Sequence, residues 1–232
     1  MVHSADIGTC KSQMNHAFCR HTQLISAAFT AAEANYFLIH HSGRPLLYAF
    51  QASRIQTAEP SWLSCKRRAV SHLPAKDARW LLDTGSLTAH LRRVSEGHFH
   101  VEVLSQRWQL PRLSERRLLN MGDREWGLVR EVLLCCRNEP WVFARSVMPA
   151  TSLVGRLARL RHLDNRPLGH LLFTDPMMSR DPYEICQLPV ADLSLGISPD
   201  SEKLLWGRRS RFLLSQHPIM VSEIFLPAFC PW

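Results

Sequence analysis

Between residues 98 and 110, apolar and polar residues alternate along the chain. Phe99, Val101 and Val103 occupy every second position, and the residues between them are a histidine and a glutamate. A period of two is typical of a β-strand that buries one face and exposes the other. The pattern therefore predicts a strand from His98 to Leu110.

Three further segments are predominantly apolar and also predict strands. They span residues 128–136, 141–147 and 217–226. Residues 137–140 (Arg-Asn-Glu-Pro) separate the first two of these segments and have the composition of a turn. The first two segments should therefore form a hairpin.

Helical patterns precede and follow these strands. Residues 74–82 and 86–94 predict two short helices, the first of which ends near Gly85. Residues 152–162 carry leucines at helical spacing with arginines between them. This segment predicts a helix that is capped by Thr151 or Ser152 and packs on the sheet.

The segment from Asp181 to Lys203 predicts a long loop, because it contains prolines, Gly196 and scattered acidic residues. A strand should begin after it, near Trp206. Runs of strands broken by helices, without a regular strand–helix–strand alternation, are typical of α+β proteins. We therefore predict an α+β fold with an antiparallel sheet.

Chain length and composition predict one domain. A chain of 232 residues with 46% hydrophobic and 21% charged residues can bury a single good core. Residues 1–60 have few charges and no sustained period, whereas the pattern becomes regular from Ser61. We expect a domain over residues 61–232, preceded by an N-terminal extension (1–60) whose order the sequence does not decide.

The net charge of +8 favours an anionic partner. Because the basic residues are scattered, with no dense run among aromatics, we expect no nucleic-acid partner and favour a small polyanionic ligand. The longest apolar stretch, residues 24–39, is short for a membrane span and contains Glu33. It lacks the basic start of a secretory signal, so we expect a cytoplasmic protein without a membrane span.

Signatures of metal and nucleotide sites are missing from the sequence. The seven cysteines form no CxxC pair, and no HExxH, GxGxxG or GxxxxGKS/T motif occurs. Histidines such as His170 have no neighbouring pattern of a catalytic triad. We therefore expect no metal and no cofactor.

Ionisable residues inside apolar strands are the main candidates for a site. Arg130, Arg145 and Glu223 each share a strand face with large hydrophobic residues, and a buried charge without a partner is costly. If the three converge in an enclosed pocket, a spare positive charge remains for an anionic ligand. The alternative is a structural ion pair between neighbouring strands, and periodicity does not decide between them. Glu131, on the face opposite Arg130, is expected to be solvated or a cross-strand partner.

Residues 206–211 (Trp-Gly-Arg-Arg-Ser-Arg) form a basic segment near the C-terminus. In a strand, alternation places Arg209 and Arg211 on one face and Arg208 on the other. We expect a solvated face with one inward arginine rather than a phosphate or nucleic-acid patch.

Several segments taken together resemble a known family in their order and spacing. They are residues 129–135 (VREVLLC), 139–141 (EPW), 144–145 (AR), 167–169 (PLG), 172–173 (LF), 179–181 (SRD), 204–212 (LLWGRRSRF), 217–218 (HP) and 223–228 (EIFLPA). The family that they resemble is the bacterial chorismate pyruvate-lyases, and the resemblance covers about residues 61–232.

The resemblance implies a fold and an activity. The implied fold is an antiparallel sheet with helices and flaps that enclose an internal ligand pocket, in a protein expected to be a monomer. The implied activity is the cofactor-independent elimination of pyruvate from chorismate, which releases 4-hydroxybenzoate in an early step of ubiquinone biosynthesis.

The resemblance also implies roles for single residues. Arg130 would bind the ring carboxylate with help from the backbone of Leu168, and Glu223 would hydrogen-bond the ring hydroxyl, so Arg130 and Glu223 are the expected catalytic residues. Arg145 would receive the other carboxylate or line the route in and out. Leu87 occupies a flap position where the family is expected to have a methionine.

A second function is a ligand-sensing domain of the kind fused to GntR-type repressors, which are similar in fold to these lyases but do not catalyse. Such sensors normally follow a winged-helix DNA-binding domain. Residues 1–60 show no convincing helix-turn-helix pattern, which favours the enzyme.

Overall fold

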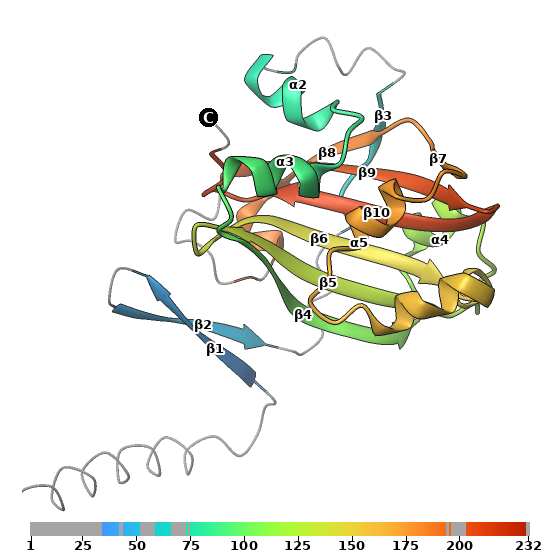
Figure 1. Cartoon of the computed structure of the whole chain (residues 1–232), viewed down its shortest axis with the longest axis horizontal. Helices are drawn as coiled ribbons and strands as arrows, with labels where there is room; N and C mark the ends of the chain where they lie inside the picture. Colours follow the sequence, from blue (N-terminus) through green and yellow to red (C-terminus); the bar gives the residue numbers. More distant parts are fainter. Residues whose placement is uncertain are drawn as a thin grey trace, which may run out of the picture.

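The computed structural model describes residues 34–41, 44–51, 59–65, 73, 75–193, 195 and 203–230 (Figure 1). Within the N-terminal extension, β1 (Ala34–His41) and β2 (Arg44–Gln51) pair as a two-stranded antiparallel sheet. Sequence reasoning assigns no element to these two segments. What was expected of the rest of residues 1–60 lies mostly outside the described residues.

The other strands of the described residues form one eight-stranded sheet. Its order is β3-β8-β9-β10-β6-β5-β4, and the short β7 pairs with β9. The strands are β3 (Leu63–Ser64), β4 (Phe99–Gln109), β5 (Gly127–Cys136), β6 (Glu139–Pro149), β7 (Met178–Arg180), β8 (Glu184–Pro189), β9 (Leu204–Leu214) and β10 (His217–Phe225). Every pairing is antiparallel, which confirms the predicted α+β class.

The strands predicted from hydrophobic pattern are confirmed. The ends of β4, β5, β6 and β10 differ from the predicted ranges by at most two residues. β5 and β6 form the predicted hairpin, in which Arg137 and Asn138 have positive φ angles of 52° and 64°. Two successive left-handed residues are typical of the tight type I′ turn, whose twist matches that of the flanking strands.

The predicted loop from Asp181 to Lys203 is wrong in part. It contains β8 and the 3-10 helix η4 (Val190–Leu193). Prolines at both ends of β8 favour a loop when only the sequence is read. The segment is nevertheless a strand, because it pairs between β3 and β9 and buries Ile185, Cys186 and Leu188.

The predicted helix over residues 152–162 is instead two 3-10 helices, η2 (Ala150–Ser152) and η3 (Gly155–His162). The predicted cap is also wrong. Thr151 donates its hydroxyl hydrogen to the Glu125 carboxylate, and Ser152 donates to the carbonyl of Pro218. Both side chains thus fasten η2 to neighbouring segments and cap no helix, although the leucines of η3 still pack on the sheet as expected.

Helices cover both faces of the sheet (Figure 1). The two predicted N-terminal helices are confirmed as α2 (Ala75–Leu81) and α3 (Leu87–Val94), and the Ser86 hydroxyl caps α3 by accepting from the Ala89 amide. α3, η3 and α5 (Leu168–Phe173) pack on one face, whereas α4 (Leu113–Leu119) packs on the other. Two apolar clusters, one under α3 and one under η3 and α5, therefore lie on the same face.

Candidate active site

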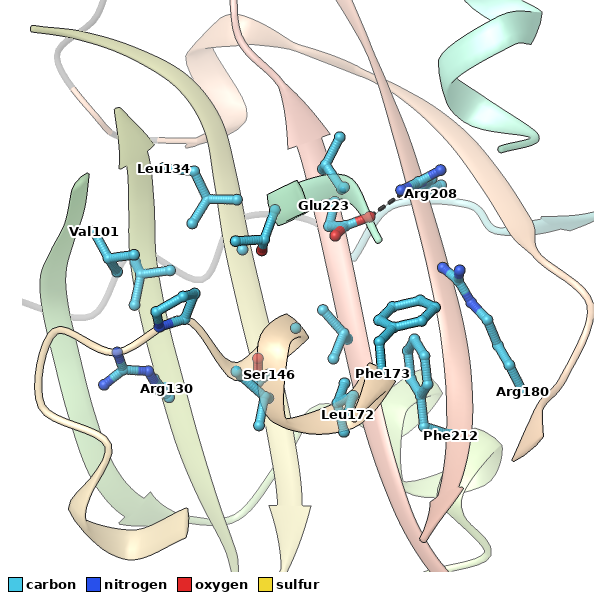
Figure 2. Close-up of a pocket in the computed structure, with 18 of the residues that line it drawn as sticks. Val101, Arg130, Leu134, Ser146, Leu172, Phe173, Arg180, Arg208, Phe212 and Glu223 are labelled. Atoms are coloured by element: carbon cyan, nitrogen blue, oxygen red, sulfur yellow. Dashed lines mark hydrogen bonds and ion pairs between the residues drawn. The ribbon is translucent and has the colours of Figure 1, made fainter. Parts of the chain in front are cut away.

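A pocket opens between these two clusters, on the face covered by α3 and α5 (Figure 2). Its floor is formed by β5, β6, β10 and β9, and the first residues of α3 and α5 contribute to its walls. Most of the lining is apolar. The polar side chains of the lining are Thr88, Arg130, Ser146, Arg180, Arg208 and Glu223.

Strand pairing brings the charged side chains of the floor to one face. Arg130 of β5 pairs with Ser146 of β6, and Glu223 of β10 pairs with Ala144 of β6 and Arg208 of β9. Residues opposite each other on antiparallel strands point to the same side of a sheet. Two strand spacings put the Arg130 and Glu223 backbones roughly 10 Å apart across the sheet, and Figure 2 shows their side chains at opposite ends of the pocket.

Arg130 is a buried cation, with 3% of its surface exposed. Its guanidinium donates to the Gln106 side-chain oxygen at 2.9 Å and to the Asp164 carbonyl at 2.6 Å. Burial lowers the pKa of Arg130, and the Asp164 carboxylate nearby opposes this shift. Within the described part of the chain no carboxylate forms an ion pair with Arg130, so its charge is available to a ligand.

Glu223 is held by the most deeply buried arginine of the pocket. Arg208, 1% exposed, donates from Nε to the Glu223 carboxylate at 2.6 Å, and from a terminal nitrogen to the carbonyls of Trp80 at 2.5 Å and Asp83 at 3.0 Å. Burial alone would lower the pKa of Arg208, but Glu223 and Tyr183 outweigh burial and raise it. The pair fixes an oriented carboxylate at this end of the pocket.

Arg180 is the third arginine of the pocket. It reaches in from β7, and its guanidinium carbon lies 3.9 Å from the centre of the Tyr183 ring and 4.7 Å from that of Phe212. Burial lowers the pKa of Arg180. Among the described lining residues, three arginines against one glutamate leave two positive charges in the pocket.

Arg145 does not join this group, so the predicted convergence of three charges is wrong for this residue. It pairs with Glu131 across the β5–β6 ladder and faces the other side of the sheet. There it binds Glu115 and Glu131, each at 2.7 Å. The alternative of a structural ion pair between neighbouring strands is therefore the observed one, and Glu131 is the cross-strand partner that the sequence suggested.

Leu87 and Leu168 both line the pocket and are the first residues of α3 and α5. The amide of a first helical residue has no acceptor within its own helix, so that of Leu168 can serve a ligand. Gly169 allows the two helices to approach closely, because a Cβ atom at this position would lie 2.9 Å from Oγ1 of Thr88.

The inward arginine predicted for the 206–211 segment is confirmed as Arg208. Its neighbour Arg209 lies on the opposite face as expected, but it is buried against Glu184 rather than solvated. Arg180 is a pocket residue that sequence reasoning missed. β7 has only three residues, too few for a periodic pattern, and the resemblance attached no role to Arg180.

No cluster of three or more His, Cys, Asp or Glu side chains suitable for a metal ion occurs in the described residues. In the same part of the chain, no helix is long and apolar enough to cross a membrane.

A pocket with surplus positive charge on its lining is suited to a small anionic molecule. The family model described as chorismate lyase matches residues 59–230. The chain belongs to the chorismate lyase family.

Curated relatives agree with this assignment. A protein of Pseudomonas aeruginosa named "Probable chorismate pyruvate-lyase" is 42% identical over 149 residues, which cover 64% of this chain and 82% of the relative. A second, from Pseudomonas entomophila and named "Probable chorismate pyruvate-lyase 2", is 41% identical over 173 residues, which cover 75% of this chain and 91% of the relative.

Solved structures similar to this chain include domains of transcription regulators. The C-terminal domain of a histidine utilization repressor from Pseudomonas syringae aligns with a TM-score of 0.47 and 12% identity, covering 57% of this chain and 94% of that one. The ligand-binding domain of a GntR-family regulator from Bordetella bronchiseptica aligns with a TM-score of 0.44 and 18% identity, covering 57% and 86%.

Proposed function

We propose that this protein eliminates pyruvate from chorismate and releases 4-hydroxybenzoate, without a cofactor, as an early step of ubiquinone biosynthesis. The observation that supports this best is the charge pattern of the pocket. Arg130 is an unneutralised cation at one end, and Glu223 is a carboxylate oriented by Arg208 at the other. A ring with a carboxylate and a hydroxyl on opposite sides complements these two ends.

The reaction requires little beyond orientation and charge stabilisation. The bond between the ring and the ether oxygen breaks, the ring carbon that bears the hydroxyl loses a proton, and the ring becomes aromatic. The proton ends on the enolpyruvyl methylene carbon, which gives pyruvate. The two products together contain the atoms of the substrate, so no oxidant, reductant or water is consumed. The protein must hold the dianion and stabilise charge that moves towards the leaving group.

The residues that line the pocket can perform both tasks. Arg130 and the Leu168 amide receive the ring carboxylate, and Leu87 packs on the ring from the flap side. The Glu223 carboxylate accepts a hydrogen bond from the ring hydroxyl. The proton leaves either to Glu223 or directly to the departing enolpyruvyl group, and a Glu223→Gln variant distinguishes the two routes.

The decisive experiment mixes purified protein with chorismate and follows the absorbance of 4-hydroxybenzoate, with pyruvate measured separately in the same samples. Equal amounts of both products, formed over many turnovers, are expected. An Arg130→Ala sample with unchanged circular dichroism is the matched control and should lose most of the activity. Binding of chorismate without conversion would instead identify a non-catalytic sensor and refute the proposal.

A further inference from the structure

Arg180 presents the pocket with a guanidinium that no carboxylate neutralises in the part of the chain described. Its Nε atom is buried and has no hydrogen-bond acceptor, and one terminal nitrogen reaches only the Thr84 carbonyl, at 3.4 Å. A buried donor without an acceptor costs roughly 1–3 kcal/mol. A ligand with a hydrogen-bond acceptor at this point would remove that cost, so the free donor indicates a ligand-binding position.

Aromatic rings hold this guanidinium in place. Its central carbon lies over the rings of Tyr183, Phe212 and Phe173 at 3.9, 4.7 and 5.9 Å from their centres. Stacking on ring faces stabilises a cation but leaves its in-plane N–H groups free to donate. The guanidinium of Arg180 is therefore held in a fixed orientation, while its Nε–H group still lacks a hydrogen-bond acceptor.

Arg180 lies at the Glu223 end of the pocket. The guanidinium of Arg208, the partner of Glu223, lies over the same Tyr183 ring at 4.9 Å. Figure 2 shows Arg180 beside Arg208 and Phe212, on the side of the pocket away from Arg130. Because Glu223 neutralises Arg208, the two remaining positive charges belong to Arg130 and Arg180, and they are spatially separated.

We infer that Arg180 receives the second carboxylate of the substrate, the one on the enolpyruvyl group, and determines the preference of the pocket for a dianion. This inference rests on the proposed function. In chorismate, the enolpyruvyl ether and the hydroxyl are on adjacent ring carbons, and Arg180 and Glu223 lie at the same end of the pocket. Negative charge moves into this group as the ether bond breaks, so Arg180 also stabilises the transition state.

The test compares two aromatic ligands, of which only one carries an ether side chain that ends in a second carboxylate. They are 4-hydroxybenzoate and 3-carboxymethoxy-4-hydroxybenzoate, a stable dianion that keeps the ether and cannot eliminate pyruvate. Their dissociation constants are measured by calorimetry with the wild-type protein and with Arg180→Gln. The variant should bind the dianion at least roughly tenfold more weakly and the monoanion almost unchanged, because a hydrogen bond between charged groups is lost only in the first case.

Two further variants keep the inference open to refutation. Arg180→Lys retains the charge without the planar donor fork, so it should lose only part of the dianion preference. Arg156→Gln removes one positive charge from an exposed site, where the arginine side chain is 54% exposed, and should change neither constant. Equal weakening of both ligands by Arg180→Gln, an unchanged preference, or the same loss in Arg156→Gln would overturn the inference.

Failure of the proposed function gives a different result. In that case wild-type protein leaves chorismate unconverted, whatever the two dissociation constants show. If the wild-type protein converts chorismate but Arg180→Gln keeps the normal preference for the dianion, the role of Arg180 is overturned and the proposed function is not.

Discussion

Replacing Arg145 with methionine removes the cation of a buried ion-pair network on the sheet face opposite the pocket. The side chains of Arg145 and Glu115 are 8% and 5% exposed, and two nitrogens of Arg145 donate to the two oxygens of Glu115 at 2.7 and 3.0 Å. Removing one partner of a buried pair costs about 3–5 kcal/mol, and Glu115 would lose its main partner, with Arg112 as the remaining cation nearby. Glu131, at 22% exposed, adds less because water screens it.

Urea unfolding measures this loss directly, and calorimetry with 4-hydroxybenzoate shows whether the pocket is affected. We expect Arg145→Met to lose several kcal/mol of stability and to keep its affinity for the ligand. Adding Glu115→Gln should restore much of the stability, because the buried charge is then absent. Arg156→Met breaks a pair between Asp175 and an arginine that is 54% exposed, and it should cost clearly less than Arg145→Met because water screens the arginine. Unchanged stability together with lost ligand affinity would refute the structural role of Arg145.

The stabilisation that the Glu115–Arg145 pair provides should depend on pH in a definite direction. Burial would raise the pKa of Glu115, but its hydrogen bonds and charge interaction with Arg145 outweigh burial and lower it. A carboxyl with a lowered pKa in the folded state stabilises the protein above its unfolded pKa, and this stabilisation is lost as the pH falls through the folded pKa. The difference in stability between wild type and Arg145→Met should therefore be largest at neutral pH and shrink in acid.

Three other substitutions test the pocket. Arg130→Ala should lower kcat/KM and the affinity for 4-hydroxybenzoate by at least roughly tenfold in steady-state kinetics and calorimetry, and unchanged values would remove Arg130 from the site. Glu223→Gln should lower the melting temperature, because Arg208 loses its buried carboxylate partner. A kcat that falls less than about tenfold assigns Glu223 to hydrogen bonding, whereas a fall of about a hundredfold or more assigns it to proton transfer. Gly169→Ala should force α3 and α5 apart and speed product release in stopped-flow experiments, and a Thr88→Ala change in the same chain should reverse the effect.

The elements that sequence reasoning found are those with a local signal. β4 shows a period of two, and β5, β6 and β10 are long apolar runs, so each could be predicted without knowing its partners. β8 and α5 have six residues each, which is too few to show a period. They form because they pack against, or pair with, neighbouring segments that are distant in the sequence. Their formation depends on tertiary contacts that a single sequence does not display.

Two of the three charged residues singled out in the sequence line the candidate site, and the reason is again local. Arg130 and Glu223 stand out because each is ionisable and surrounded by apolar residues within its own strand. Arg145 has the same local surroundings, but both faces of β6 are apolar, so the strand alone does not show which face it shares with Arg130. Only the register, in which Glu131 and not Arg130 pairs with Arg145, sends its side chain to the far side of the sheet.

The attachment of Arg208 has a consequence for how Glu223 is oriented. Its backbone acceptors, the carbonyls of Trp80 and Asp83, precede α3 in the chain, and the Tyr183 hydroxyl also donates to the Asp83 carbonyl. The orientation of Glu223 therefore depends directly on the segment that leads into α3, whose backbone carbonyls hold Arg208. In the proposed function, the carboxylate that accepts from the ring hydroxyl is thus oriented by contacts within the protein, before any substrate binds.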